Sequence, residues 1–402
     1  MAPQPVPRLE SIRVRNYRAL RDLKLAPIQP FTVLVGPNGS GKSTVFDVFA
    51  FLSECFEGGL RRALDRRGKL AELRTRDQSG PLEFEIRYRE APGLSPITYR
   101  LSIDEDASGP VVAEEVLQWS RRGRGRPFQF LVFARGEGQV VSGETPDVDA
   151  ERIHERLDAP DMLAVSALGQ FARHPRVSAL RRFITGWYLS YITAESTRGN
   201  AEAGPQERLS RTGDNLPNVI QFLQERHSER LETIFHVLRD RVPRLSHVST
   251  DPLPDGRLLL RLHDAPFSTP ILARFASDGT MKMLAYLLVL YDPEPPQLIG
   301  IEEPENHLHP RLLQELAEEC RAAAQRSQVL VTSHSQSLVD ALRPQELFVL
   351  QRDAKGHTRA TCARDITGVT ELVAEGAALG DVWREGYLER PVPGPRKQAE
   401  SH

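Results

Sequence analysis

The amino-acid sequence predicts an α/β fold with a mixed or parallel core sheet, an antiparallel β subdomain and a helical lobe. Short alternating runs fill the first part of the chain, helical periodicity replaces them, and a mixed strand and helix pattern then returns. A chain of 402 residues can bury a core large enough for such a fold. We therefore expect an N-terminal lobe with the antiparallel β region over 1–150, a helical lobe over 151–244, a C-terminal lobe over 245–388 and a disordered tail over 389–402.

The N-terminal lobe begins with residues 8–35, whose alternating apolar and polar side chains predict three strands. The last of these, residues 31–35, is continuously apolar, which is typical of a central strand. The runs "LEFEIRYR", "ITYRLSI" and "FQFLVFA" between residues 81 and 142 continue the alternation and predict an antiparallel region. The later helical segments carry no sustained heptad pattern, so no long coiled coil is expected.

Composition restricts the partners and the compartment. A formal net charge of −2 provides no overall basic field, so a nucleic acid would have to bind a local patch. The stretch 121–130, "RRGRGRPFQF", is either such a patch or a solvated hairpin turn. Three cysteines without metal or disulfide spacing indicate a reducing compartment. No apolar run approaches the roughly 20 residues that cross a bilayer, and we expect a cytoplasmic protein without a membrane partner.

A glycine-rich loop follows the central strand directly. Residues Gly36, Pro37, Asn38, Gly39, Ser40, Gly41, Lys42, Ser43 and Thr44 form a G-x-x-x-x-G-K-S motif, and the apolar helical run "VFDVFAFL" follows it. Between a strand and a helix, this loop is typical of a site whose backbone N–H groups and helix N-terminus bind phosphates. Lys42 is then expected to reach the β- and γ-phosphates, and Ser43 to bind Mg²⁺.

The segment "LIGIEEPENHLHP", residues 298–310, places three carboxylates where an apolar strand ends. Adjacent glutamates repel each other unless a cation is shared. We expect Glu302 to lie on the Mg²⁺ side and Glu303 to act as the base that orients the attacking water. His307 and His309 resemble a metal pair, but they lack a third ligand at metal-site spacing, and we expect them to line an interface instead.

Two further motifs carry a family resemblance. "SDGT", residues 277–280, before an apolar helix resembles the signature motif of ABC-type ATPases, and "VLVTSHSQSLVD" resembles their switch segment, with His334 as its histidine. Together with "IRVRNYRAL", "GPNGSGKST" and "IEEPENHLHP" in this order, they resemble the P-loop ATPase head of the SMC/RecF/OLD-like class. The resemblance covers nearly the whole chain. It is strongest to compact single-chain predicted ATPases without a long coiled coil or a Toprim domain.

The resemblance implies that the protein is an ATPase with ATP and Mg²⁺ as cofactors, and that Glu303, Lys42 and His334 act in hydrolysis. It also implies that the signature residues Ser277, Asp278, Gly279 and Thr280 act on a second subunit, with Ser277 and Gly279 contacting the γ-phosphate bound there, which gives a homodimer with two ATP sites.

Three more residues have two interpretations each. Asn16 and Arg18 match a segment that lies near the nucleotide in relatives, or they are ordinary polar residues at a strand end. Gln78 is either the glutamine that contacts Mg²⁺ or an exposed loop residue. Glu302 stands where the family usually has Asp, and its side chain is one methylene longer.

The expected function is an ATP-dependent dimer that switches a DNA-associated process, in repair, genome maintenance or defence against mobile DNA. No nuclease motif follows the ATPase motifs, so a nuclease or other effector would be a separate protein. Two alternatives stay open: the ATPase subunit of an ABC transporter, and a nucleotide-dependent scaffold with little turnover.

Overall fold

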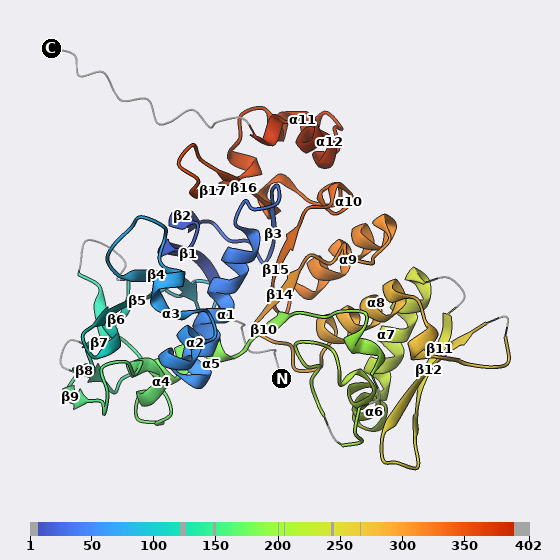
Figure 1. Cartoon of the computed structure of the whole chain (residues 1–402), viewed down its shortest axis with the longest axis horizontal. Helices are drawn as coiled ribbons and strands as arrows, with labels where there is room; N and C mark the ends of the chain where they lie inside the picture. The colour runs from blue at the N-terminus through green and yellow to red at the C-terminus, as the bar shows by residue number, and fades with distance from the viewer. Residues whose placement is uncertain are drawn as a thin grey trace.

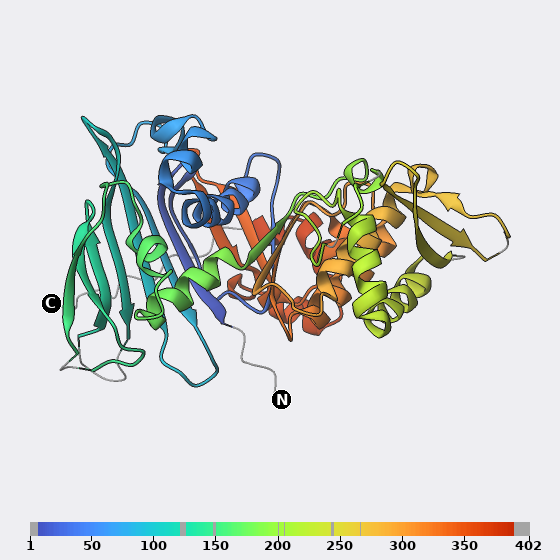
Figure 2. The ribbon, with the colours of Figure 1, turned by 90° about the horizontal axis from the view of Figure 1, so that it is seen from below.

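The computed structural model describes residues 7–120, 126–147, 150–199, 201–204, 206–242, 245–265 and 267–389. Residues 121–125 of the basic stretch and 390–402 of the expected tail lie outside the described residues. The chain forms a β-rich lobe and a mainly helical lobe on either side of a central sheet (Figures 1 and 2).

The β-rich lobe is built on an eight-stranded antiparallel sheet, in the order β2-β1-β4-β5-β6-β7-β8-β9. Buried and more exposed positions alternate along strands such as β4, as the sequence pattern predicts for a sheet with one buried face. The antiparallel region is confirmed, and it extends past the expected end of the lobe to Arg156. Its strands are β1 (Arg8–Tyr17), β2 (Leu20–Leu25), β4 (Leu82–Arg89), β5 (Ile97–Asp106), β6 (Gly109–Trp119), β7 (Phe128–Ala134), β8 (Glu137–Val141) and β9 (Arg152–Arg156).

The central sheet has six strands in the order β10-β14-β15-β3-β16-β17, and all of its neighbours are parallel except β16 and β17. Strand β3 is interior and buried throughout, which confirms its predicted central place. Leu34 belongs to the hydrophobic core shared with the eight-stranded sheet, whereas Val33 and Val35 belong to the core on the other face. The strands are β3 (Phe31–Val35), β10 (Trp187–Ser190), β14 (Leu298–Glu302), β15 (Gln328–Ser333), β16 (Leu347–Arg352) and β17 (Thr358–Cys362).

Helix α1 (Lys42–Gly58) packs between the two large sheets. Its Phe51 ring contacts Tyr17 of β1 and Phe84 of β4, and its Phe46 ring lies against Gly300 of β14. The other helices are α2 (Leu60–Asp65), α3 (Lys69–Leu73), α4 (Ala164–Leu168), α5 (Pro175–Thr185), α6 (Leu216–Arg226), α7 (Ser228–Arg241), α8 (Asp278–Leu290), α9 (Pro310–Ala323), α10 (Gln336–Val339), α11 (Val369–Ala374) and α12 (Leu379–Arg384).

Residues 151–244 do not form one helical unit. Helices α4 and α5 pack on α1, whereas α6 and α7 pack with α8 and the small sheet of β11 (Leu245–Pro252), β12 (Leu258–Asp264) and β13 (Ile271–Leu272). Between them, β10 pairs with β14 of the central sheet. The four residues of β10 are too few to show a strand period, and only their parallel pairing with a distant strand makes them extended.

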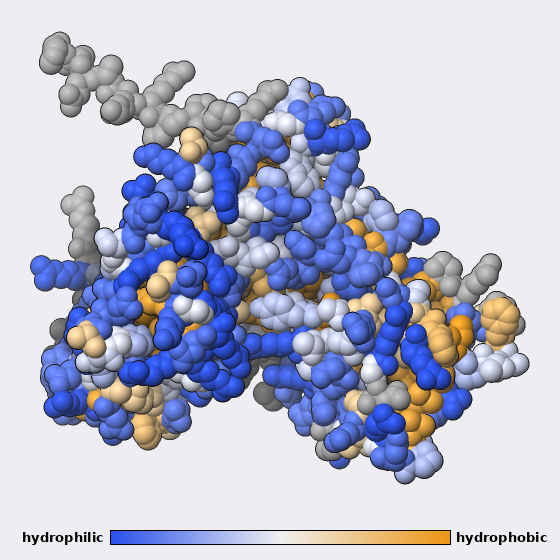
Figure 3. All heavy atoms as spheres, in the orientation of Figure 1, coloured by the Kyte–Doolittle hydropathy of each residue, from blue (hydrophilic) through white to orange (hydrophobic). Residues whose placement is uncertain are grey.

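Most of the face in Figure 3 is hydrophilic, and hydrophobic residues gather over the lobe that contains α7, β11 and β12. Phe267 and Phe275 are the most exposed large hydrophobic side chains of the described residues. Within the described ranges, no helix combines the length and apolar character that a membrane span requires.

Candidate active site

The glycine-rich loop lies where β3 ends and α1 begins, as its motif predicts. Gly41 has φ 105°, a conformation that favours glycine, and a Cβ there would lie 2.3 Å from Thr358 Oγ1. Thr358 Oγ1 in turn donates to the Ser40 carbonyl at 2.9 Å. The loop is therefore held against β17.

Lys42 is folded over the same loop. Its Nζ donates to the Gly36 carbonyl at 2.8 Å and to the Pro37 carbonyl at 3.3 Å. Burial lowers the pKa of Lys42, and the negative charges of Glu303, Glu305 and Glu302 partly oppose this shift. An ammonium group in this place lies beside the N–H groups that would surround a phosphate.

Parallel pairing brings the ends of distant strands together. Glu302 pairs with Thr332, and Ser333 pairs with Val35, so the carboxyl ends of β14, β15 and β3 meet at one edge. The Ser43 hydroxyl hydrogen-bonds Glu302 across this edge. Burial raises the pKa of Glu302, the bond to Ser43 counteracts part of this shift, and the charge of Glu303 adds to it. A hydroxyl and a carboxylate are hard oxygen ligands, and they fit Mg²⁺.

Glu303 has φ 43°, in the left-handed region that a glutamate rarely adopts. Its backbone N–H donates to the Thr332 carbonyl at 2.9 Å, and Asn306 Nδ2 lies 3.5 Å from its Oε2. Such a conformation costs on the order of 1–3 kcal/mol, and it is typical of active sites where the surrounding structure enforces it.

His334 follows β15 and lies beside the glutamates. Its Nδ1 is 2.9 Å from Glu305 Oε1 and 3.9 Å from Glu303 Oε1. The structure thus places His334, the predicted switch histidine, beside Glu303, the predicted base. Sequence reasoning assigned no role to Glu305, although its place in "EEPE" was a signal that a third carboxylate lay near the pair.

The signature residues begin helix α8. Ser277 is the N-cap, its Oγ accepts from Thr280 N at 3.1 Å, and Asp278 pairs with Arg198 and with His307 Nδ1. They line a hollow of about 570 Å³, to which the loop 36–44 contributes no residue. The remaining lining residues are Asp240, Arg241, Val242, His307, His309, Arg311 and Leu312. The start of α8 therefore lies apart from the glycine-rich loop 36–44, and a helix N-terminus is a type of position that can bind an anion.

His307 and His309 have structural partners in this hollow. His307 pairs with Asp278 at 3.1 Å, and His309 caps α9 by accepting from Arg311 N at 3.3 Å.

The Asn16 side chain is hydrogen-bonded to backbone groups of its own chain. Its Nδ2 donates to the Gly80 and Pro81 carbonyls at 3.0 and 3.1 Å, and its Oδ1 accepts from Thr75 N at 3.2 Å. Because these bonds engage both ends of the buried amide, Asn16 fastens the loop before β4 to the turn after β1.

Arg18 and Gln78 line a separate groove. Arg18 pairs with Asp47 at 2.9 Å, and Gln78 Nε2 donates to the Asp77 carbonyl at 2.9 Å. No hydrogen bond of the described residues joins Gln78 to Ser43 or Glu302. The prediction that Gln78 contacts Mg²⁺ gains no support from this placement.

This groove, of about 980 Å³, is strongly basic. It adjoins the phosphate loop, because Thr358 N donates to the Ala19 carbonyl while Thr358 Oγ1 reaches Ser40. Of its cations, Arg21, Arg352 and Lys355 form no ion pair within the described part of the chain. Its charged lining residues are Arg18, Arg21, Arg67, Arg74, Arg76, Arg352 and Lys355, with Glu72 and Asp77.

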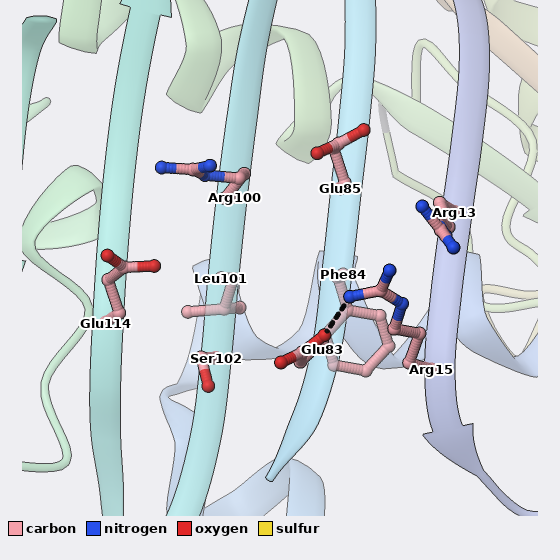
Figure 4. Close-up of a pocket in the computed structure, with 9 residues that line it drawn as sticks. All are labelled: Arg13, Arg15, Glu83, Phe84, Glu85, Arg100, Leu101, Ser102 and Glu114. Atoms are coloured by element: carbon pink, nitrogen blue, oxygen red, sulfur yellow. Dashed lines mark hydrogen bonds and ion pairs between the residues drawn. The ribbon is translucent and has the colours of Figure 1, made fainter. Parts of the chain in front are cut away.

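A different pocket, of about 220 Å³, lies on the eight-stranded sheet (Figure 4). Arg15 pairs with Glu83 at 2.9 Å on the neighbouring strand, and Arg13 pairs with Asp22 at 2.6 Å. Opposite charges on adjacent strands stabilise a solvated sheet face. This pocket is therefore a surface feature of the sheet, and the loop 36–44 contributes no residue to it.

The comparisons with known proteins agree with this geometry. Residues 31–340 match the family described as "AAA domain, putative AbiEii toxin, Type IV TA system". The DNA replication and repair protein RecF of Chlorobium phaeobacteroides (strain BS1) is 39% identical over 59 residues, which cover 15% of this chain and 16% of RecF. The Old nuclease of Escherichia phage P2 is 22% identical over 380 residues, covering 87% of this chain and 60% of the nuclease.

The chain thus spans less than two thirds of each of these relatives. Among solved structures, an Smc head bound to the C-terminal winged-helix domain of ScpA has a TM-score of 0.53 at 14% identity, with 88% of this chain and 96% of that chain covered. An Smc head of Pyrococcus furiosus with an extended coiled coil has a TM-score of 0.52 at 13% identity, with 92% and 100% covered. Both show the same fold. The chain belongs to the matched AAA-domain family, and its fold is that of the Smc heads.

Proposed function

We propose that the protein hydrolyses ATP in a homodimer and that this dimer switches a DNA-associated process. One observation carries the proposal: the loop 36–44, Glu302, Glu303 and His334 meet at one sheet edge, and the start of α8 lies apart from that edge. A two-fold dimer lets each signature segment face the partner's phosphate loop. Two ATP molecules then lie at one interface.

Within each site, Lys42 and the loop N–H groups bind the β- and γ-phosphates. Ser43 and Glu302 hold Mg²⁺, which neutralises charge on the phosphates when it is bound. Glu303 orients the attacking water and accepts its proton, and His334 contacts the γ-phosphate. ATP favours the closed dimer because it contacts both subunits only there, so hydrolysis releases the dimer.

The DNA-associated part rests on the relatives and on one surface. One relative is named for DNA replication and repair, and another is a nuclease. Three cations of the basic groove, Arg21, Arg352 and Lys355, form no ion pair with the residues that the structure describes, and such a surface suits a nucleic-acid backbone. We propose that DNA bound there promotes hydrolysis and that a separate nuclease or effector responds to whether the dimer is closed or released.

A nucleotide-dependent scaffold with little turnover is the second candidate. Glu302 favours it, because its side chain is one methylene longer than that of the Asp usual at this position.

Dimerisation is tested by measuring molar mass by light scattering with and without Mg-ATP. Glu303→Gln is expected to form a stable dimer with ATP. Glu303→Gln combined with Ser277→Arg is expected to bind ATP and stay monomeric, because the arginine side chain would occupy the surface of residues 277–280 that faces the partner. A dimer of unchanged mass in the double variant would contradict the reciprocal arrangement.

The DNA link is tested by the ATPase rate of the wild type with and without duplex DNA. We expect stimulation by DNA, and its loss when Arg21, Arg352 and Lys355 are all replaced by Glu. Arg156→Glu on β9 is the matched control, since its side chain is 81% exposed on another surface. ATP-dependent dimers with negligible turnover in every condition would favour the scaffold.

A further inference from the structure

Glu305 is a nearly buried carboxylate at the active-site edge whose role the motifs leave open. Its side chain is 9% exposed. Its Oε1 accepts from the Ser333 hydroxyl at 3.0 Å and from the His334 backbone N–H at 2.5 Å, and it lies 2.9 Å from His334 Nδ1. One oxygen thus takes three contacts from two consecutive residues.

These contacts fix the switch segment at the end of β15. The His334 side chain is 46% exposed, and a half-exposed imidazole without a partner would rotate freely. With Nδ1 held by Glu305, Nε2 is the ring nitrogen left for a ligand. A carboxylate that holds one nitrogen of a histidine sets the direction of the other.

The loop that carries Glu305 is itself anchored on its other side. Lys282 of α8 is buried, and its Nζ donates to the Asn306 carbonyl at 2.7 Å. His307, with φ 74°, pairs with Asp278 beside the signature serine. Glu305 therefore connects a switch histidine to a loop that is fixed on the signature helix and that begins at Glu303.

We propose that Glu305 is a positioning residue for ATP hydrolysis: it aims Nε2 of His334 at the γ-phosphate and keeps His334 and Glu303 in one arrangement. This inference rests on the proposed hydrolysis of ATP. Because Glu305 acts through His334, its removal affects turnover and leaves nucleotide affinity in place. Removal of such outer partners typically lowers activity by about 10–100-fold.

The test is a double-mutant cycle on the full chain. Glu305→Gln, His334→Ala and the double variant are compared for kcat, for KM and for the Kd of a non-hydrolysable ATP analogue. We expect Glu305→Gln to lower kcat by about 10–100-fold with the Kd changed less than twofold, and to add less than twofold to the loss in His334→Ala. Glu346→Gln is the matched control, because Glu346 is 8% exposed and binds Arg321 and a backbone N–H away from the site.

The outcomes separate this inference from the proposed function. Independent losses that multiply in the double variant would overturn the action of Glu305 through His334, and so would a normal kcat in folded Glu305→Gln. In both cases hydrolysis by the wild type still stands. A wild type without turnover, with and without DNA, would overturn the hydrolytic function and this inference together. Glu305→Asp gives a second variant if Glu305→Gln does not fold.

Discussion

Buried carboxylates occur in two regions of the molecule with opposite surroundings. In the eight-stranded sheet, fully buried Glu115 accepts from Tyr99 OH at 2.8 Å, from Ala164 N at 2.5 Å and from Val165 N at 3.1 Å. Both of its oxygens are bonded by groups of its own chain. It fastens the start of α4 to strand β6, and it has no bonding capacity turned toward a ligand.

The carboxylates after β14 are different. Glu303 is held in a left-handed conformation, Glu302 has a hydroxyl partner on the phosphate loop, and Glu305 Oε2 is buried without a hydrogen-bond partner among the described residues. An unsatisfied buried oxygen is costly. Because Glu90 Oε1 and Glu315 Oε2 are also buried without a partner among the described residues, an unpartnered oxygen alone does not mark a site. The contrast lies in the surroundings: Glu115 is bonded only by groups that fasten its own fold, whereas the three glutamates lie beside the glycine-rich loop and His334.

The largest expected effect is on kcat, and it should occur in one of the two regions only. Glu303→Gln should lower kcat by about 10²–10⁴-fold, because the base that accepts the proton from water is lost. Glu115→Gln should leave kcat unchanged. Steady-state ATPase assays at saturating Mg-ATP measure both, and an equal loss in the two variants would remove the distinction drawn here.

The second prediction concerns pH and stability. Burial raises the pKa of Glu115 from 4.5 to about 7, although its three hydrogen bonds oppose the shift. A carboxyl whose pKa is higher in the folded state favours folding while it is protonated, so this stability is present below pH 4.5 and is lost as the pH rises toward about 7. The loss is roughly 3 kcal/mol. Urea unfolding of the wild type and Glu115→Gln from pH 5 to 8 should show a smaller pH slope in the variant, and equal slopes would contradict the prediction.

The smallest expected effect is on the free energy of unfolding, when the hydroxyl of Ser277 is removed. Ser277 Oγ caps α8 through Thr280 N, and we propose that it also serves a second subunit. Ser277→Ala should cost about 1 kcal/mol of unfolding free energy from the lost cap, whereas Ser277→Gly should cost a few tenths. Urea unfolding without nucleotide measures this cost. If both variants unfold like the wild type, the serine does not stabilise the helix start.

Local motifs made much of the site predictable. The motif of the loop 36–44 lies within nine consecutive residues, and the alternating and continuous apolar runs identify β1 to β5 and β7 without knowledge of their partners. Asn16 shows the limit of this reasoning. Its motif left two interpretations open, a place near the nucleotide and ordinary strand-end polarity, and its amide bonds to residues about 60 positions away, which no local pattern contains.

By itself, the sequence determined the α/β class, the phosphate loop, the carboxylate pair and the order of motifs that places the chain in its family, since each depends on neighbouring residues. Only the tertiary structure decided that 151–244 is divided between two lobes, that Glu305 holds His334, and that cations from 18–76 and 352–355 form one groove. These features depend on parallel pairing between strands far apart in the chain. That pairing is set by long-range register, which a single sequence does not display.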